Sequence, residues 1–359
     1  MFSNLTLTAT DFYYSPVKTE ISINKFITVD QNNFAITKFE TSFKMDQHSI
    51  TAKNLKVKTT NSSIDADLNI QYSSLESLKD SIQFAILNFE IGNVSLRNSY
   101  IIYFNPGLSS LNFFKNPTNV TTVSGNIKGS LNNLIGNNLE IKTGVNTLLK
   151  TDFIVTGLPS VKTAYVDIPN LKINSGKEDI SMIADSLIPG TIELPEKISI
   201  EVVFRGKMNS FESTIDLKSS YGSAHLVASL DENENIKSKV NITDFDLGRL
   251  LKDTSMFGQV SLVAEADGHG LEIKNLSANI KTEVSDIRVN KYTYHNLVLN
   301  GGIAEHKFEG TLNLKDENAA FDLNALVNLN PDQEQYKFHL NLLGADLQKL
   351  NFSKDDIRI

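Results

Sequence analysis

The chain has 359 residues and contains no cysteine, no tryptophan and only eight prolines. Without cysteine it can form neither a disulfide bond nor a thiolate metal site, although this absence points to no particular compartment. The formal net charge is −8 and Lys and Arg form no cluster, which argues against a nucleic-acid-binding protein. Asn is plentiful, and Ser, Thr, Val and Ile are also abundant, a composition typical of β-structure with polar outward faces.

The sequence also lacks any run of the roughly 20 apolar residues that a membrane-spanning helix needs. Residues 4–8 already have a strand pattern, and no basic and apolar signal-peptide regions precede them. Two interpretations follow: a cytoplasmic protein, or an internal fragment whose signal or membrane anchor lies upstream. The end at residues 355–359 carries no terminal signal and suits a fragment equally well.

Residues 294–350 contain the clearest pattern, in which apolar and polar side chains alternate through three segments separated by turns. Successive side chains of a strand point to opposite faces, so the segment predicts a β-meander with one apolar face. We expect this face to be lined by Phe308, Leu312, Leu314, Phe321, Leu323, Val327, Leu329, Tyr336, Phe338, Leu340 and Leu342.

The same alternation recurs along the chain and predicts roughly 25 strands, or a ribbon on the order of 120 Å long if they form one sheet. The apolar face of such a ribbon must pack on a second sheet, close on itself or curl into a trough. We predict an all-β fold: an elongated, twisted antiparallel β-ribbon curled into a taco-like trough with an apolar inner face and few short helices. Three β-repeat blocks are expected, at residues 1–120, 121–257 and 258–359.

One short helix is predicted near residues 177–187, where Ile180, Ile183, Ala184 and Leu187 fall on one face and Ser175 or Asp179 could cap the start. Three further segments place an acidic residue before Ile or Leu: residues 88–94 (NFEIGNV), 244–250 (DFDLGRL) and 344–350 (GADLQKL). An acid satisfies free backbone N–H groups at the start of a helical turn, so each segment is predicted to interrupt the ribbon.

Motifs for catalysis or metal binding are missing from the sequence. The six histidines form no HxH or HExxH spacing, and no GxSxG, phosphate-binding loop or paired-carboxylate motif occurs. Residues 231–235 (DENEN) resemble the start of a calcium loop, but Ile236 occupies the position that requires glycine. We therefore predict no catalytic residue, no metal site and no cofactor, and we expect that the protein is not an enzyme.

Several segments resemble the repetitive β-region of the AsmA-like/TamB superfamily, which includes the translocation and assembly module proteins. They are residues 55–64 (LKVKTTNSSI), 188–196 (IPGTIELPE) and 244–251 (DFDLGRLL), the last followed by 258–260 (GQV) and 267–271 (DGHGL). The resemblance implies a periplasmic β-trough in an inner-membrane-anchored protein, with the anchor outside this fragment. It also implies phospholipid transport toward the outer membrane and a possible partner, an outer-membrane barrel protein of the Omp85 type.

Three hypotheses for function remain open from the sequence. In the first, the apolar face shelters and conducts phospholipid acyl chains between the inner and outer membranes. In the second, the chain is a scaffold that assembles outer-membrane proteins by adding their strands to its sheet edge. In the third, the face is the dry core of a β-sandwich surface protein or adhesin. The many strands and the lack of an obvious second layer favour the first.

Overall fold

The computed structural model describes residues 2–30, 34–184, 188–272, 275–328, 330 and 335–359. Their contacts divide the chain into an N-terminal unit, Met1–Asp185, and a C-terminal unit, Ser186–Ile359. The division of the chain into three blocks stays a prediction. The boundaries predicted for these blocks fall where β7 and β15 begin.

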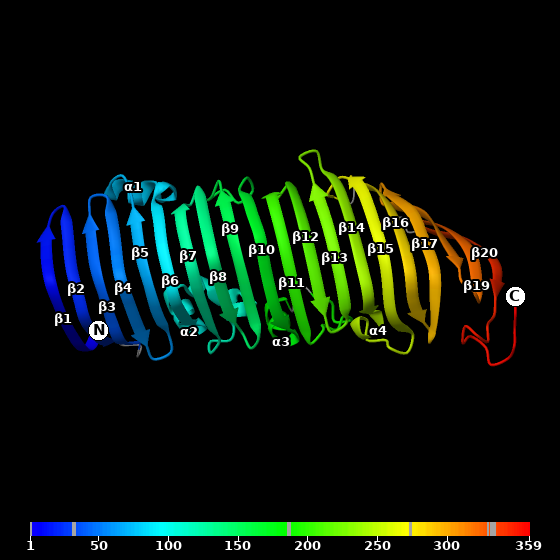
Figure 1. Ribbon diagram of the computed structural model, residues 1–359, viewed down its shortest axis with the longest axis horizontal. Coiled ribbons are helices and arrows are strands. Elements are labelled where there is room, and N and C mark those ends of the chain that lie inside the picture. Colours follow the sequence, from blue (N-terminus) through cyan, green and yellow to red (C-terminus); the bar gives the residue numbers. More distant parts are fainter. Residues whose placement is uncertain (1, 31–33, 185–187, 273–274, 329, 331–334) are drawn as a thin grey trace. The chain divides into compact units, whose positions relative to one another are not determined.

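The N-terminal unit is an antiparallel meander in which each strand pairs with its neighbours in the chain. Its strands lie side by side in chain order, from blue to green in Figure 1. They are β1 (Phe2–Ser15), β2 (Lys18–Asp30), β3 (Ala35–Asp46), β4 (Ser49–Thr59), β5 (Ser63–Gln71), β6 (Ile86–Arg97), β7 (Val120–Ser130), β8 (Asn133–Thr143), β9 (Thr147–Thr156) and β10 (Tyr165–Gly176).

Short helices connect some of these strands. Between β5 and β6 lie α1 (Leu75–Asp80) and the 3-10 turn η1 (Ile82–Phe84). Between β6 and β7 lie α2 (Asn98–Phe104), η2 (Pro106–Ser110) and η3 (Asn112–Phe114), and after β10 comes α3 (Lys177–Ala184). Helices α2 and α3 lie at one end of the strands and α1 at the other (Figure 1).

The C-terminal unit is a second antiparallel meander of the same kind. One helical turn, α4 (Leu247–Leu250), interrupts it. The strands are β11 (Lys197–Lys207), β12 (Ser210–Ser219), β13 (Gly222–Leu230), β14 (Asn235–Asp246), β15 (Phe257–His269), β16 (Ser277–Val289), β17 (Tyr292–Ala304), β18 (Lys307–Lys315), β19 (Ala319–Asn328) and β20 (Gln335–Ala345).

The prediction of an all-β antiparallel fold with few short helices is confirmed. Among the described residues, neither unit closes into a barrel, because its first and last strands pair with their neighbours in the chain and not with each other. The described chain has twenty strands, each 9 to 14 residues long, rather than roughly 25.

The pairing register keeps apolar side chains on one face of each sheet. In the N-terminal unit a continuous row across β4–β7 contains Ala52, Leu68, Phe89 and Ile127. In the C-terminal unit a row across β11–β14 contains Val202, Ile215, Leu226 and Val240. Because a slip of one residue would turn a strand's apolar side chains to the opposite face, the register is fixed by burial.

β-Bulges at Asn and Asp residues accompany this register. The pairing shifts between Ala52 and Leu55, where Asn54 has a φ of +51°, and between Gly136 and Leu139, where Asn138 has a φ of +51°. Asn and Asp tolerate this left-handed backbone conformation better than other non-glycine residues. A bulge bends its strand and increases the local twist, so these residues curve the sheet.

A side chain of the next strand accepts a hydrogen bond from the backbone N–H of each bulge residue. The N–H of Asn54 donates to Asp67 Oδ1 at 2.5 Å, and that of Asn138 donates to Asp152 Oδ1 at 2.6 Å. A third bulge repeats the arrangement, with Ser261 Oγ accepting from the N–H of Asp244 at 3.0 Å. The extra donor at each of these three bulges is therefore satisfied.

The acid-containing breaks have different outcomes. Asp246 caps α4, accepting from the N–H of Arg249 at 2.9 Å, and Asp346 accepts from the N–H of Lys349 at 3.1 Å in a similar turn. These two breaks are confirmed. The break predicted at residues 88–94 is wrong, because this segment lies inside the continuous strand β6, where Ala66 and Leu68 of β5 pair with it.

The helix predicted near residues 177–187 is confirmed as α3 as far as Ala184; residues 185–187, including Leu187, lie outside the described part. Asp179, one of its two suggested caps, has a different role. It is only 2% exposed, and its carboxylate accepts hydrogen bonds from Val145 N, Asn146 N and Thr147 Oγ1 in the β8–β9 turn, each 2.8 Å long. Burial raises the pKa of Asp179, but these bonds outweigh it and the pKa lies below its usual value.

Replacing Asn138 tests the role of the bulges. We expect Asn138→Val to lower the free energy of unfolding by about 1–2 kcal/mol, because a β-branched residue resists the left-handed backbone. Asn138→Gly should cost only a few tenths of a kcal/mol, roughly, since glycine adopts positive φ freely. Urea unfolding followed by circular dichroism measures both. The control is Asn137→Val, at an exposed neighbour without positive φ; an equal loss there would refute the explanation.

The apolar face as the candidate functional site

The predicted lining residues of β18–β20 lie on one face and form three cross-strand rows. In each row, a residue of β18 lies opposite one of β19, which in turn lies opposite one of β20. The three rows are Phe308–Val327–Tyr336, Leu312–Leu323–Leu340 and Leu314–Phe321–Leu342. The remaining residue, Phe338, lies opposite Ala325. Leu329 lies outside the described residues. That these side chains contact lipid stays a prediction.

Exposure of this face rises from β18 to β20. Leu314 is 2% exposed and packs in a cluster with Ala319 and Leu350, so the segment after β20 folds back over this end of the face. In contrast, Tyr336, Phe338 and Leu340 of β20 are 57%, 63% and 58% exposed. The residues of the rows on β18 and β19 other than Leu314 are half-buried. The open surface is therefore largest along β20.

Strand β17 extends the same face and was not included in the predicted lining. Leu297 lies opposite Leu314 and Leu299 opposite Leu312, while Tyr292 and Tyr294 pack against the Leu314 cluster. The sequence signal was hidden because Tyr294 and Leu297 are three residues apart, across His295 and the positive-φ Asn296. A period of two does not detect this spacing.

The ring of Phe308 lies against two glycines of the apolar face. A Cβ atom on Gly301 would come within 2.7 Å of the Phe308 ring, and one on Gly310 within 2.8 Å. An aromatic ring packed over strand glycines replaces the side-chain contacts that the glycines lack. Where β17 and β18 meet, the surface therefore consists of the Phe308 ring lying over two glycines, and it is apolar.

The described part of the structure contains no second sheet that would cover the middle of this face. A β-sandwich would bury the central residues of its inner faces, but Leu226, Val240 and Leu299 are only half-buried. The apolar residues that are fully buried are few and include small ones such as Ala66, Ala85 and Ala164. The sandwich alternative does not fit this distribution.

A polar cluster lies where β17 begins and β18 ends, beside the Leu314 cluster. The Asp316 side chain is 1% exposed and accepts hydrogen bonds from Tyr292 Oη at 2.5 Å, Asn318 N at 2.9 Å and His295 N at 3.1 Å. Burial raises the pKa of Asp316, but the hydrogen bonds from Tyr292, Asn318 and His295 outweigh it and the pKa lies below its usual value. Burial, then the bond to Asp316, raises the pKa of Tyr292.

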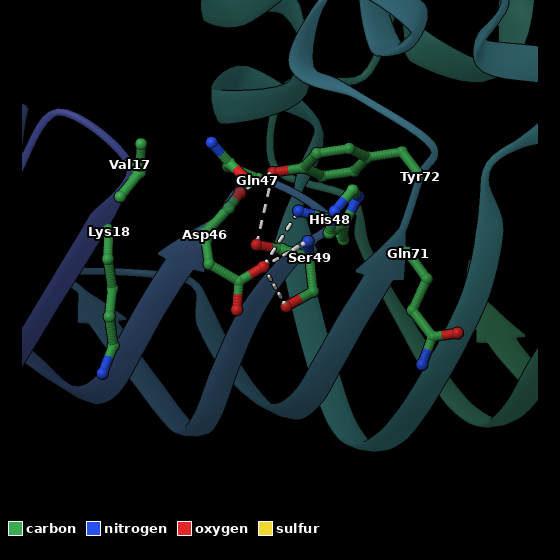
Figure 2. A pocket seen from close by; sticks show the side chains of 8 residues that line it. All are labelled: Val17, Lys18, Asp46, Gln47, His48, Ser49, Gln71 and Tyr72. Atoms are coloured by element: carbon green, nitrogen blue, oxygen red, sulfur yellow. Dashed lines mark hydrogen bonds between the residues drawn. The ribbon is translucent and has the colours of Figure 1, made fainter.

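An open depression lies at the β3–β4 turn, and most of the residues that line it have polar side chains (Figure 2). Asp46 Oδ1 accepts from the backbone N–H groups of His48 and Ser49, and Tyr72 Oη donates to the carbonyl oxygens of Asp46 and Ser49. The hydrogen bond from the His48 N–H is the largest cause that lowers the pKa of Asp46. These polar groups bind one another and hold the turn, so the depression offers no set of groups directed at a ligand.

Two further observations concern the described residues. No group of three or more His, Asp or Glu side chains is placed to hold a metal ion. None of the helices there is long and apolar enough to cross a membrane.

Comparisons of the chain with protein-family profiles, with curated proteins and with solved structures found no match.

Replacing Asp316 should make stability less dependent on pH. A folded-state pKa below the unfolded value of about 3.9 means that the carboxylate stabilises the fold above that pH and loses this effect as pH falls through the folded pKa. We expect Asp316→Asn to lower the free energy of unfolding by about 2 kcal/mol at pH 7. The difference from the unmodified protein should shrink below about pH 4. The control is Glu317→Gln, at the exposed neighbouring residue. It should change neither the free energy of unfolding at pH 7 nor its dependence on pH. Urea unfolding at several pH values measures this, and a difference constant down to pH 2 would contradict it.

Proposed function

We propose that the apolar face binds phospholipid acyl chains and lets them move across the strands. The observation that supports this most is the shared apolar face. Strand after strand in each unit places its apolar side chains on the same side, half-exposed and without a covering sheet in the described residues. Monomeric soluble proteins rarely leave so large an apolar surface without a partner.

The chemistry of the face suits an apolar chain that slides. Burial of each methylene group contributes about 0.8 kcal/mol and needs no particular orientation. The rows on β18–β20 consist of Leu, Phe, Val and Tyr, so a step of about 4.8 Å from strand to strand exchanges similar contacts. Polar head groups would remain in water beyond the face.

We further propose a periplasmic location, as part of an inner-membrane-anchored envelope protein that conducts phospholipid between the inner and outer membranes. This part of the proposal is supported by the resemblance of residues 55–64, 188–196 and 244–251 to the AsmA-like/TamB superfamily. The proposed barrel partner of the Omp85 type is supported by that resemblance alone.

Site-specific photo-crosslinking in cells tests the lipid proposal. A crosslinking amino acid at Leu323 or Leu340 should capture phospholipid, whereas one at Asn324 or Asn341 on the opposite face should not. Each pair differs by one position along the same strand and therefore by the face alone. Captured lipid would be identified by mass spectrometry. Capture from Asn324 and Asn341 with none from Leu323 and Leu340 would overturn the proposal.

A charged residue in the row should stop capture by its neighbour. With the crosslinker at Leu312, we expect Leu323→Asp, directly opposite, to reduce captured lipid at least tenfold, because covering a carboxylate with an acyl chain removes it from water at a cost of several kcal/mol. Asn324→Asp is the matched control and should leave capture and expression unchanged. Undiminished capture in the Leu323→Asp variant would contradict a role for the face.

A further inference from the structure

The longest connection between successive strands of the N-terminal unit consists of residues 98–119, between β6 and β7. It contains α2, η2 and η3, and we call it the β6–β7 insertion. Its helix α2 lies at the end of the strands opposite α1 (Figure 1). Two residues are enough to join antiparallel neighbours such as β7 and β8, so pairing of the strands does not require the insertion.

The β6–β7 insertion exposes large apolar side chains. Tyr103, Phe104 and Leu111 are 43%, 71% and 52% exposed. Two of them are fixed by a ring cluster around Phe34, which stacks on Tyr103 at 5.5 Å between ring centres and meets Phe104 edge-on, also at 5.5 Å. The rings are therefore held in place and still reach water. Exposed apolar groups gathered in this way mark an interaction surface.

The charge of the β6–β7 insertion differs in sign from that of the whole chain, which is −8. Asp and Glu make up 42 of the 359 residues, but none lies between Glu90 and Glu140, where Arg97, Lys115 and Lys128 occur. Lys115 is the one charged residue of the insertion and is exposed. A local excess of basic residues on an acidic protein favours an anionic partner.

The acidic side chains that neighbouring elements bring to the insertion are mostly occupied. Asp30 of β2 accepts a hydrogen bond from Tyr103 Oη at 2.5 Å. Helix α3 contacts η3 and carries two acids, of which Asp179 is buried under the β8–β9 turn and Glu178 is exposed. Glu178, beside Lys177, is therefore the one exposed acid among these three.

The backbone of the β6–β7 insertion pairs largely with itself. The N–H groups of Asn105, Leu108, Leu111 and Phe114 each donate to a carbonyl oxygen three or four residues earlier. Unpaired backbone groups are costly where lipid replaces water. These N–H groups would keep their partners if the insertion entered a membrane surface.

We propose that the β6–β7 insertion binds the surface of a lipid bilayer that contains anionic lipids. Tyr103, Phe104 and Leu111 enter the boundary between head groups and acyl chains, and Lys115 lies beside the lipid phosphates. Aromatic side chains favour this depth, and apolar side chains next to basic ones are typical of segments that lie in the membrane interface. The inference does not rest on acyl-chain binding by the apolar face of the sheet.

The absence of tryptophan allows a direct test with the intact chain, because a single introduced tryptophan reports its own surroundings. In Phe104→Trp, vesicles of equal parts phosphatidylcholine and phosphatidylglycerol should shift the emission to shorter wavelength. Lipids brominated on the acyl chains should quench it, because the ring would lie about 5–10 Å into the interface. The matched control is Phe84→Trp, in η1 next to α1 at the other end of the strands, which is 65% exposed and should show neither effect.

Co-sedimentation with the same vesicles measures the affinity. We expect Phe104→Ser/Leu111→Ser to weaken binding at least tenfold, because two large apolar side chains no longer leave water. Lys115→Glu should weaken it as well, whereas Lys53→Glu, at an exposed lysine of β4, should not. Leu323→Asp should leave vesicle binding unchanged, which separates this inference from acyl-chain binding by the apolar face.

Four outcomes would overturn the inference. They are no binding to vesicles, an equal emission shift in Phe84→Trp, undiminished binding after both serine substitutions, and self-association of the chain that these substitutions abolish. The last would assign the surface to a second copy of the chain. Because Phe104→Trp keeps a large aromatic side chain, the emission measurement decides the question even if the serine variant does not fold.

Discussion

Every strand of this protein must keep its apolar side chains on the same side of the sheet. The rest of the structure depends on this consistent orientation from strand to strand. The side-chain period of a strand is two, so one extra residue would reverse the faces beyond it. Bulges absorb extra residues in register: Ala52 and Leu55, like Gly136 and Leu139, are three apart and still face the same side. Asn54 and Asn138 make this possible because they adopt positive φ.

Because the described residues include no covering sheet, stability has to come from cross-strand contacts and from the strand ends. Side-chain pairs across a sheet each contribute roughly 0.2–1 kcal/mol, which sums over many strands. At the ends, buried polar groups fasten the turns: Asp179 holds the β8–β9 turn and Asp316 the β18–β19 turn. Asn98, fully buried, donates to the carbonyl oxygens of Phe113 and Asn116 and so closes the loop after α2. The middle of the apolar face can remain open because the ends are secured.

Alternation in the sequence was sufficient to predict the β-fold, the apolar face and the side of β18–β20 on which each described lining residue lies. It failed where local sequence signals have more than one structural solution. Residues 88–94 look like a capped break, but pairing with β5 on both sides of a bulge at Gly92 keeps them in a strand. Asp179 looks like a helix cap, but the β8–β9 turn offers it three donors. The burial of Leu314 under Leu350 depends on a tertiary contact that no periodicity encodes.

The neighbour-to-neighbour pairing within each unit has a consequence for how such a sheet could change in evolution. Within each unit a hairpin contacts mainly the strands directly before and after it, and a bulge such as that at Asn54 or Asn138 acts on its own strand pair, so curvature is set locally. Duplicating or deleting a whole hairpin would alter the number of strands while leaving the cross-section and the facing of every other side chain intact. Loss of a single strand would reverse the direction of all that follow. Viable changes in length should therefore come in steps of two strands.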